Sequence, residues 1–225
     1  MLPYQHLLHA STRESLGISL KNSVVIIDEA HNLIETVTSI HTVTLTYNQV
    51  RMSVSQLAAY LQKYKNRLLG KNIAYIRQIV HIIKAILKFL EPKPEKKDTV
   101  IHVNDFLHTL NIDHINMFKI QKYLEASSLA RKLNGFIDKE LLNSQQPDQQ
   151  QSSMPALTQI ESFMLALTHP NKDGRIVANY SENPEVKYML LNPAEVFRPI
   201  VEDARSIILA GGTMEPVRLG FGNIH

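Results

Sequence analysis

Residues 24–33, Val-Val-Ile-Ile-Asp-Glu-Ala-His-Asn-Leu, decide the fold. Four consecutive β-branched residues, Val24 to Ile27, predict a strand buried on both faces of a parallel sheet, because no polar residue alternates with them. The spacing of Leu33, Ile34 and Val37 then indicates a short helix or turn that leaves the sheet. The stretch is typical of an α/β protein.

A second apolar run, Ile207 to Ala210, ends in Gly211-Gly212-Thr213 and shows the same change from strand to polar loop. Both strands need partners, and the sequence between them offers few. We therefore expect the two runs to share one parallel sheet that is interrupted in sequence by a mostly helical insertion.

The first part of the middle region predicts an αα-hairpin. Hydrophobic residues recur at three- and four-residue spacing over residues 47–68 and again over 76–90, which is the period of a helix. Gly70-Lys71-Asn72 lies between the two series and offers a place for the chain to reverse. Pro92 and Pro94 are expected to end the second helix.

The second part of the middle region is also predicted to be helical. Asn104 is placed to cap a helix that begins at Asp105, and residues 115–142 predict further helix with a break near Gly135. The glutamine-rich residues 144–155 lack the apolar surface that would offset chain ordering, so we expect a disordered loop there. The remaining expected elements are a helix over 156–167, a turn at Asp173-Gly174, a strand over 186–191 and a helix over 194–204.

Composition excludes several classes of protein. The 24 basic and 21 acidic residues give a formal net charge of +3, a weak bias toward polyanionic partners. The absence of cysteine excludes disulfides, thiolate zinc sites and iron–sulfur ligands within this chain. The N-terminus has no signal-peptide pattern, and charged residues interrupt the most apolar stretch, 73–90, so we expect a soluble intracellular protein without a membrane span.

The acidic pair Asp28-Glu29 has two interpretations. Ligands of open α/β sheets bind at the carboxyl ends of strands, where Asp28 could hold Mg²⁺ and Glu29 could orient an attacking water. Alternatively, the pair is a solvated helix start stabilised by the helix dipole, which the bare pattern favours. The next residues, Ala30-His31-Asn32, favour the first interpretation, because they complete a DEAH box after a strand.

The sequence VVIIDEAHNL, preceded by Pro3-Tyr4 and Leu7-Leu8, resembles motif II of the iron–sulfur DEAH DNA helicases, the XPD-like group of superfamily two. Further similarities favour the ChlR-type branch and keep the same order along the chain. They are His9-Ala10-Ser11-Thr12-Arg13, residues 113–123 (DHINMFKIQKY), Arg131-Lys132-Leu133 with Gly135-Phe136, residues 187–193 (KYMLLNP), and Ala210-Gly211-Gly212-Thr213-Met214, which looks like motif III.

The resemblance implies a domain organisation. Residues 1–40 and 172–217 would belong to a RecA-like motor domain, and residues 41–171 would form a helical, Arch-like insertion. Residues 218–225 resemble nothing in the family.

The resemblance also implies roles for particular residues. The box Asp28, Glu29, Ala30 and His31 would bind ATP, with Asp28 as the Mg²⁺ ligand and Glu29 activating water. His31 would couple the nucleotide state to an opposing motor domain, and Gly212 and Thr213 would link hydrolysis to DNA contact. The family further implies a 4Fe-4S cluster, a nuclear location, DNA as partner, and association with replication or cohesion proteins.

The sequence departs from the family pattern in three respects. It contains no GxxxxGK[ST] phosphate loop, none of the four cluster-binding cysteines, and no counterpart of the second motor domain after Pro216. We therefore expect the central slice of an ATP-dependent DNA helicase, inactive by itself. The alternative is a non-catalytic DNA- or protein-binding module that acts through the helical insertion. An ordinary DEAH RNA helicase is disfavoured, because that group does not normally carry such an insertion.

Three other groups of residues permit functional interpretations, but the structural interpretation is favoured for each. A basic cluster at the hairpin tip is expected to be a solvated helix end rather than a phosphate contact. Two histidine pairs lack the ligands that a metal site needs, and three tyrosines at helical spacing are expected in the core rather than stacked on bases. The residues concerned are Lys63, Lys65, Arg67 and Lys71; His6 with His9 and His108 with His114; and Tyr60, Tyr64 and Tyr75.

Overall fold

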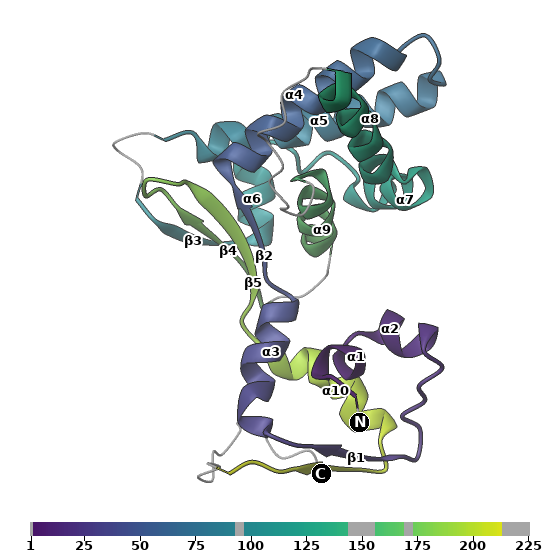
Figure 1. Cartoon of the computed structure of the whole chain (residues 1–225). Helices are drawn as coiled ribbons and strands as arrows, with labels where there is room; N and C mark the ends of the chain where they lie inside the picture. Colours follow the sequence, from purple (N-terminus) through teal and green to yellow (C-terminus); the bar gives the residue numbers. More distant parts are fainter. Residues whose placement is uncertain (1, 93–96, 144–155, 169–172, 213–225) are drawn as a thin grey trace. The chain divides into compact units, whose positions relative to one another are not determined.

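The computed structural model describes residues 2–92, 97–143, 156–168 and 173–212. The chain divides into two compact units (Figure 1). Unit 1 comprises residues 1–42 and 190–225, and unit 2 comprises residues 43–189. Each unit has its own hydrophobic core, so each is described by itself.

Unit 1 is built from two segments that are far apart in the sequence. Its strands, β1 and β6, pair in parallel with Val24 opposite Ser206 and Ile27 opposite Leu209, which confirms the predicted pairing of the two apolar runs. The elements are α1 (Tyr4–Leu8), α2 (Ala10–Ser15), β1 (Val24–Ile27), the 3-10 turn η1 (Ala30–Asn32), α3 (Leu33–Ile40), α10 (Pro193–Asp203) and β6 (Ser206–Leu209).

The prediction that β1 is buried on both faces is wrong. Ile27 is buried, but the side chains of Val24 and Ile26 are 53% and 67% exposed. An apolar strand is buried only where another element covers it, and the described sheet of unit 1 has two strands with the core on one side. The core residues are Leu8, Leu20, Ile27, Ala30, Leu33, Val37, Phe197 and Ile200.

Helix α10 begins where local sequence favours a helix start. The Asn192 side chain accepts a hydrogen bond from the Ala194 N–H at 3.2 Å, and Pro193 occupies the first turn, where its missing N–H costs nothing. The bounds lie within one residue of the predicted helix over 194–204.

Unit 2 combines an antiparallel sheet with helices. Its elements are β2 (Val43–Thr46), α4 (Tyr47–Tyr64), α5 (Gly70–Leu90), β3 (Thr99–His102), α6 (Val103–Thr109), α7 (Met117–Ser127), α8 (Leu129–Asn143), α9 (Ala156–Thr168), β4 (Gly174–Asn179) and β5 (Glu185–Leu190). The strand order is β2-β5-β4-β3, and α6 and α9 pack against this sheet (Figure 1).

The sheet order decides where the chain returns to unit 1. Strands β4 and β5 pair with β3 and β2, so residues 174–189 belong to unit 2. The return comes at Leu190, later than the residue 172 expected from the sequence, because the strand pattern alone does not show which sheet a strand joins.

The predicted αα-hairpin is confirmed by α4 and α5, which pack against each other (Figure 1). A capping box starts α4: the Thr46 hydroxyl accepts from the Gln49 N–H, and the Gln49 side chain accepts from the Thr46 N–H at 3.0 Å. Buried leucines and isoleucines such as Leu57, Ile79 and Ile83 line the seam. The second helix ends at Leu90, before Pro92, as predicted.

Two predicted helix boundaries are wrong. Helix α6 starts at Val103 with His102 as its N-cap, so Asn104 lies inside the first turn. The helical break falls at Ser128, which has a left-handed backbone (φ 49°), while Gly135 lies inside α8. The half-buried carboxylate of Glu161 accepts from the Ala130 N–H at 3.2 Å and so satisfies a donor at the start of α8. The predicted loop at 144–155 lies outside the described residues.

Candidate nucleotide site at the DEAH box

The DEAH box lies directly after β1 and is tied to the end of β6. The Ala210 N–H donates to the Ile27 carbonyl at 2.8 Å, and the Ala30 N–H donates to the Ala210 carbonyl at 2.9 Å. Because β1 and β6 are parallel, Asp28 and the segment that leads to Gly212 emerge at the same edge of the sheet. This is the edge at which ligands of open α/β sheets bind.

The backbone of Glu29 is in the left-handed region, with φ 52° and ψ 41°. This conformation is costly for a residue with a Cβ. The Glu29 N–H donates to the Asp28 carboxylate at 2.9 Å, and the Glu29 carbonyl accepts from the Asn32 N–H at 3.0 Å. These bonds hold the turn in which the strand gives way to the helical segment at Ala30.

The side chains of Glu29 and His31 contact each other. His31 Nδ1 lies 3.1 Å from Glu29 Oε2, and the two side chains are 44% and 60% exposed. The carboxylate that the sequence assigns to water activation is therefore held by the imidazole assigned to coupling. Both groups remain accessible to solvent and to a ligand at this edge.

Tyr4 supports the box from α1. Its O–H donates a hydrogen bond to the backbone carbonyl of Asp28. Burial, followed by the negative charges of Asp28 and Glu29, raises the pKa of the Tyr4 phenol, which keeps it a donor. Tyr4 is part of the family resemblance, but the resemblance gives it no role, and no spacing pattern links it to a residue 24 positions away.

Arg13 holds the helix that carries Tyr4. Its guanidinium donates to the carbonyl of Leu7 and, at 3.4 Å, to that of Leu8, at the end of α1. Cationic side chains at a helix C-terminus satisfy carbonyls that have no partner within the helix. Arg13 belongs to the His9–Arg13 stretch noted in the sequence, so this part of the resemblance has a structural reason.

Gly212 is the last described residue of the candidate site, exposed and two residues after Ala210. Among the residues that the structure describes, a side chain at Gly212 would meet no atom within 4 Å. Thr213 lies outside the described residues. The structure thus brings together Asp28, Glu29, Ala30 and His31 with the approach to Gly212.

The donor set of the site suits Mg²⁺ better than zinc. Asp28 presents an exposed carboxylate with one oxygen bound to the Glu29 N–H, and its second oxygen is available to a cation. Mg²⁺ is held in proteins by one or two carboxylates together with waters and substrate phosphates. Over the described ranges, no three His, Cys, Asp or Glu side chains form a group that could hold a metal, and this includes the histidines considered above.

The three tyrosines lie in or against the core of unit 2, as predicted. Tyr60 is buried, and Tyr60 and Tyr64 pack on Phe136 with ring centroids 5.8 and 6.0 Å away. Tyr75 stacks on Tyr123 at 4.6 Å. These contacts account for the rings without a nucleic-acid base.

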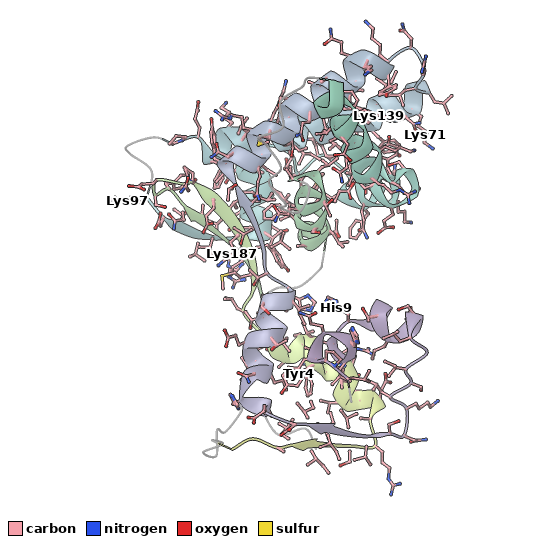
Figure 2. The ribbon with its side chains drawn as sticks, in the orientation of Figure 1. Tyr4, His9, Lys71, Lys97, Lys139 and Lys187 are labelled. Carbon is pink, nitrogen blue, oxygen red and sulfur yellow. The ribbon has the colours of Figure 1, made fainter. Side chains whose placement is uncertain are left out.

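The basic cluster lies at the end of the hairpin, where Figure 2 labels Lys71. The Lys63 ammonium lies 5.2 Å from the centroid of the Phe136 ring, a cation–π contact within unit 2.

In the part of the chain that the structure describes, no helix is both long and apolar enough to cross a membrane.

The chain is similar to known proteins over most of its length. Residues 1–50 match the family model DEAD_2. The chain is 40% identical over 220 residues to the ATP-dependent DNA helicase chl1 of Aspergillus clavatus, covering 96% of this chain and 30% of that protein. It is 36% identical to the ATP-dependent DNA helicase DDX11 of Danio rerio, again covering 96% of this chain and 30% of the relative.

A solved structure described as XPD_APO has the same fold over 95% of this chain and 35% of its own, with a TM-score of 0.53 and 17% identity. The chain spans 25% to 30% of the length of the curated helicases it matches. The family model covers the DEAH box, and the sequence similarity extends through both units. The chain is therefore similar, over 96% of its length, to part of the ATP-dependent DNA helicases chl1 and DDX11; its first 50 residues match DEAD_2, and it shares its fold with the XPD_APO structure.

Proposed function

We propose that this chain forms part of the ATP-hydrolysing motor of a DNA helicase. The main support is the position of the DEAH box at the carboxyl end of β1. Backbone hydrogen bonds from Ala30 to Ala210 and from Ala210 to Ile27 connect the box to the segment between β6 and Gly212. The relatives are named ATP-dependent DNA helicases, which supports ATP as the nucleotide and DNA as the substrate.

In this proposal Asp28 is the ligand of Mg²⁺, which when bound neutralises phosphate charge during phosphoryl transfer. The Asp28 carboxylate is exposed and accepts a hydrogen bond from the Glu29 N–H, and the Tyr4 O–H donates to the backbone carbonyl of Asp28. The chain thus contributes an exposed carboxylate on a backbone that Tyr4 holds. Ala30 contributes its N–H to the bond that holds the loop on Ala210.

Glu29 is proposed to orient and deprotonate the attacking water. In the described conformation Glu29 Oε2 contacts His31, and the exposed carboxylate has a second oxygen with which it could accept a hydrogen bond from a water. His31 would couple the nucleotide state to an opposing motor domain. Gly212 and Thr213 would connect this edge to the DNA path.

The wider context follows from the same proposal. Unit 1 would be the part of the RecA-like domain present in this chain, and unit 2 the Arch-like insertion. A nuclear location and association with replication or cohesion proteins are proposed on the strength of the family. A 4Fe-4S cluster would need ligands from outside these 225 residues, which contain no cysteine.

The test uses turnover. The 225-residue chain is expected to show no DNA-stimulated ATPase activity, whereas a protein extended to the length of the relatives should hydrolyse ATP and lose that activity on Glu29→Gln. Turnover by the isolated chain would contradict its predicted inactivity. Unchanged turnover in the extended Glu29→Gln protein would contradict the role of Glu29.

A second candidate function rests on the independence of unit 2. It has its own four-stranded sheet and its own core, so it can present a surface without the motor. In this alternative the chain is a non-catalytic module that binds DNA or protein. Deleting residues 43–189 should then abolish binding, and binding that survives the deletion would exclude the module.

A further inference from the structure

The charge of the chain is divided unequally between the two units. Unit 1 contains 5 Lys and Arg against 8 Asp and Glu, a net charge of −3. Unit 2 contains 19 against 13, a net charge of +6. The net charge of +3 for the whole chain is therefore the sum of an acidic unit 1 and a basic unit 2. A polyanion would be attracted to unit 2.

The excess in unit 2 is concentrated in the helical hairpin. No aspartate or glutamate occurs between Glu35 and Glu91. The segment from Tyr47 to Leu90, which is described throughout, contains eight Lys and Arg residues. Surface helices commonly pair Glu with Lys at i,i+4 spacing, which stabilises the helix. Neither α4 nor α5 contains such a pair, because neither has a carboxylate.

Four of the cationic or titratable side chains of α5 form one row. Arg77, His81, Lys84 and Lys88 follow each other at steps of four, three and four residues, so they lie on one face of the helix. All four are exposed. The buried residues of α5 occupy the opposite face and include Ile79, Ile83 and Ile86. We call these four side chains the α5 row.

Resting on the proposed function, we propose that the α5 row binds the phosphate backbone of a DNA strand. The row spans eleven residue steps, or about 16 Å along the helix axis. Phosphates of one strand advance about 3.4 Å per nucleotide in B-form DNA, so the row is long enough to face several of them. Lysine and arginine are the side chains that neutralise backbone phosphates and release counterions.

A solvated surface does not account for the row equally well. Lys84 and Lys88 are like charges at i,i+4 spacing, which destabilise a helix. A single glutamate on this face would remove that repulsion and keep the helix soluble. The arrangement instead keeps every charge on α4 and α5 positive, which favours a polyanionic ligand.

An acidic protein partner fits the row less well than DNA. Protein interfaces are depleted in lysine and depend on buried aromatic or aliphatic anchors. No large hydrophobic side chain is exposed on α5; the exposed residues beside the row include Ala74 and Gln78. This surface offers cationic side chains but no hydrophobic anchor residues. Contacts to a nucleic-acid backbone are made by such cationic and polar side chains.

The test measures binding of the 225-residue chain to a fluorescein-labelled oligothymidine of about 20 nucleotides by anisotropy, at salt concentrations between about 50 and 200 mM. The variant is the triple substitution Arg77→Gln, Lys84→Gln and Lys88→Gln. Each lost contact to a single strand should reduce the slope of log K against log salt by about 0.7, so the expected reduction is about 2. The affinity of the triple variant for the oligonucleotide at low salt should also be lower than that of the wild type.

A matched control removes the same charge elsewhere on unit 2. Lys97→Gln, Lys122→Gln and Lys187→Gln lie outside α4 and α5, and Figure 2 labels Lys97 and Lys187. This control should leave the salt slope within about 0.7 of the wild type. Equal loss in both triple variants would show that net charge alone binds DNA and would overturn the proposal. Circular dichroism should show the same helix content for all three proteins.

Two further measurements separate the possible outcomes. If a poly-glutamate competitor binds the wild type and loses that binding in the row variant while DNA binding persists, the surface serves an acidic protein and the proposal fails. The second measurement is ATP turnover of the extended protein, which is assayed separately from oligonucleotide binding. ATPase failure in an extended protein therefore contradicts the motor, whereas an unchanged salt slope in the row variant contradicts only the α5 row.

Discussion

His31 Nδ1 lies 3.1 Å from Glu29 Oε2, and the two residues are separated in sequence only by Ala30. The contact depends on the left-handed backbone of Glu29, at φ 52°, which turns the chain sharply after β1. Both side chains are exposed, and contacts between exposed polar side chains contribute little to stability, at most about 1 kcal/mol. The strained turn is therefore not explained by the stability of the pair, and a functional role for Glu29 is consistent with it.

The cost of this turn is measurable. Glycine adopts a left-handed backbone without the Cβ clash that costs other residues about 1–2 kcal/mol. We expect Glu29→Gly to be more stable than Glu29→Ala by about 1 kcal/mol, although both lose the carboxylate and the His31 contact. Urea unfolding followed by circular dichroism would measure the difference. Equal stability of the two variants would show that the backbone at Glu29 is unstrained.

A buried hydroxyl in α4 gives a second prediction. Ser53 is fully buried, and its Oγ has no hydrogen-bond partner among the described residues. An unsatisfied buried polar group costs about 1–3 kcal/mol, so Ser53→Ala should raise the free energy of unfolding by about 1 kcal/mol. Ser55→Ala is the control, because Ser55 is exposed and donates to the Met52 carbonyl at 2.8 Å. A destabilised Ser53→Ala protein would show that the hydroxyl is satisfied in solution.

The success and failure of the sequence predictions have physical causes. The strand before Asp28 and the hairpin over residues 47–90 were predictable, because hydrophobic period and turn residues are local signals. The burial of β1 could not be predicted, because the exposure of Val24 and Ile26 depends on which element covers the sheet. The break at Ser128 escaped because serine seldom adopts φ 49°.

At the candidate site, sequence order placed the DEAH box but not its supports. The Tyr4 O–H, from α1, donates to the Asp28 carbonyl, and the carbonyl of Ala210, directly after β6, accepts from the Ala30 N–H. Both contacts join residues far apart in the sequence, and neither residue type signals its role. The absence of carboxylates between Glu35 and Glu91 was visible in the sequence, but the α5 row needed the helix bounds and exposures of the structure.

A third prediction concerns Gly135, where the sequence predicted a helical break that the structure does not have. It lies exposed inside α8, and a Cβ added there would meet no atom within 4 Å. Alanine is better than glycine in a helix interior by about 1 kcal/mol. Gly135→Ala should therefore raise the free energy of unfolding by about that amount in urea titrations. Gly17→Ala should instead destabilise, because Gly17 has φ 66°. A destabilised Gly135→Ala protein would indicate that the helix breaks at residue 135 after all.

The last prediction concerns pH. Burial raises the pKa of the Glu161 carboxyl above its ordinary value, and the hydrogen bond from the Ala130 N–H offsets only part of this rise. A raised pKa in the folded state means that folding favours the protonated form. The contribution of Glu161 to stability is therefore fully present below its unfolded pKa and is lost as pH rises through the folded pKa.

Glu161→Gln removes the charge and keeps an oxygen that can accept from Ala130. The difference in unfolding free energy between this variant and the wild type should therefore grow in favour of glutamine from about pH 4 to pH 7. Glu125→Gln is the control, because Glu125 is exposed and accepts from the Gln121 amide at 2.9 Å. Urea titrations at several pH values would measure both. A difference that is constant with pH would mean that folding does not shift the pKa of Glu161, and one that shifts toward the wild type would mean that folding favours the ionised carboxylate; either result would contradict the prediction.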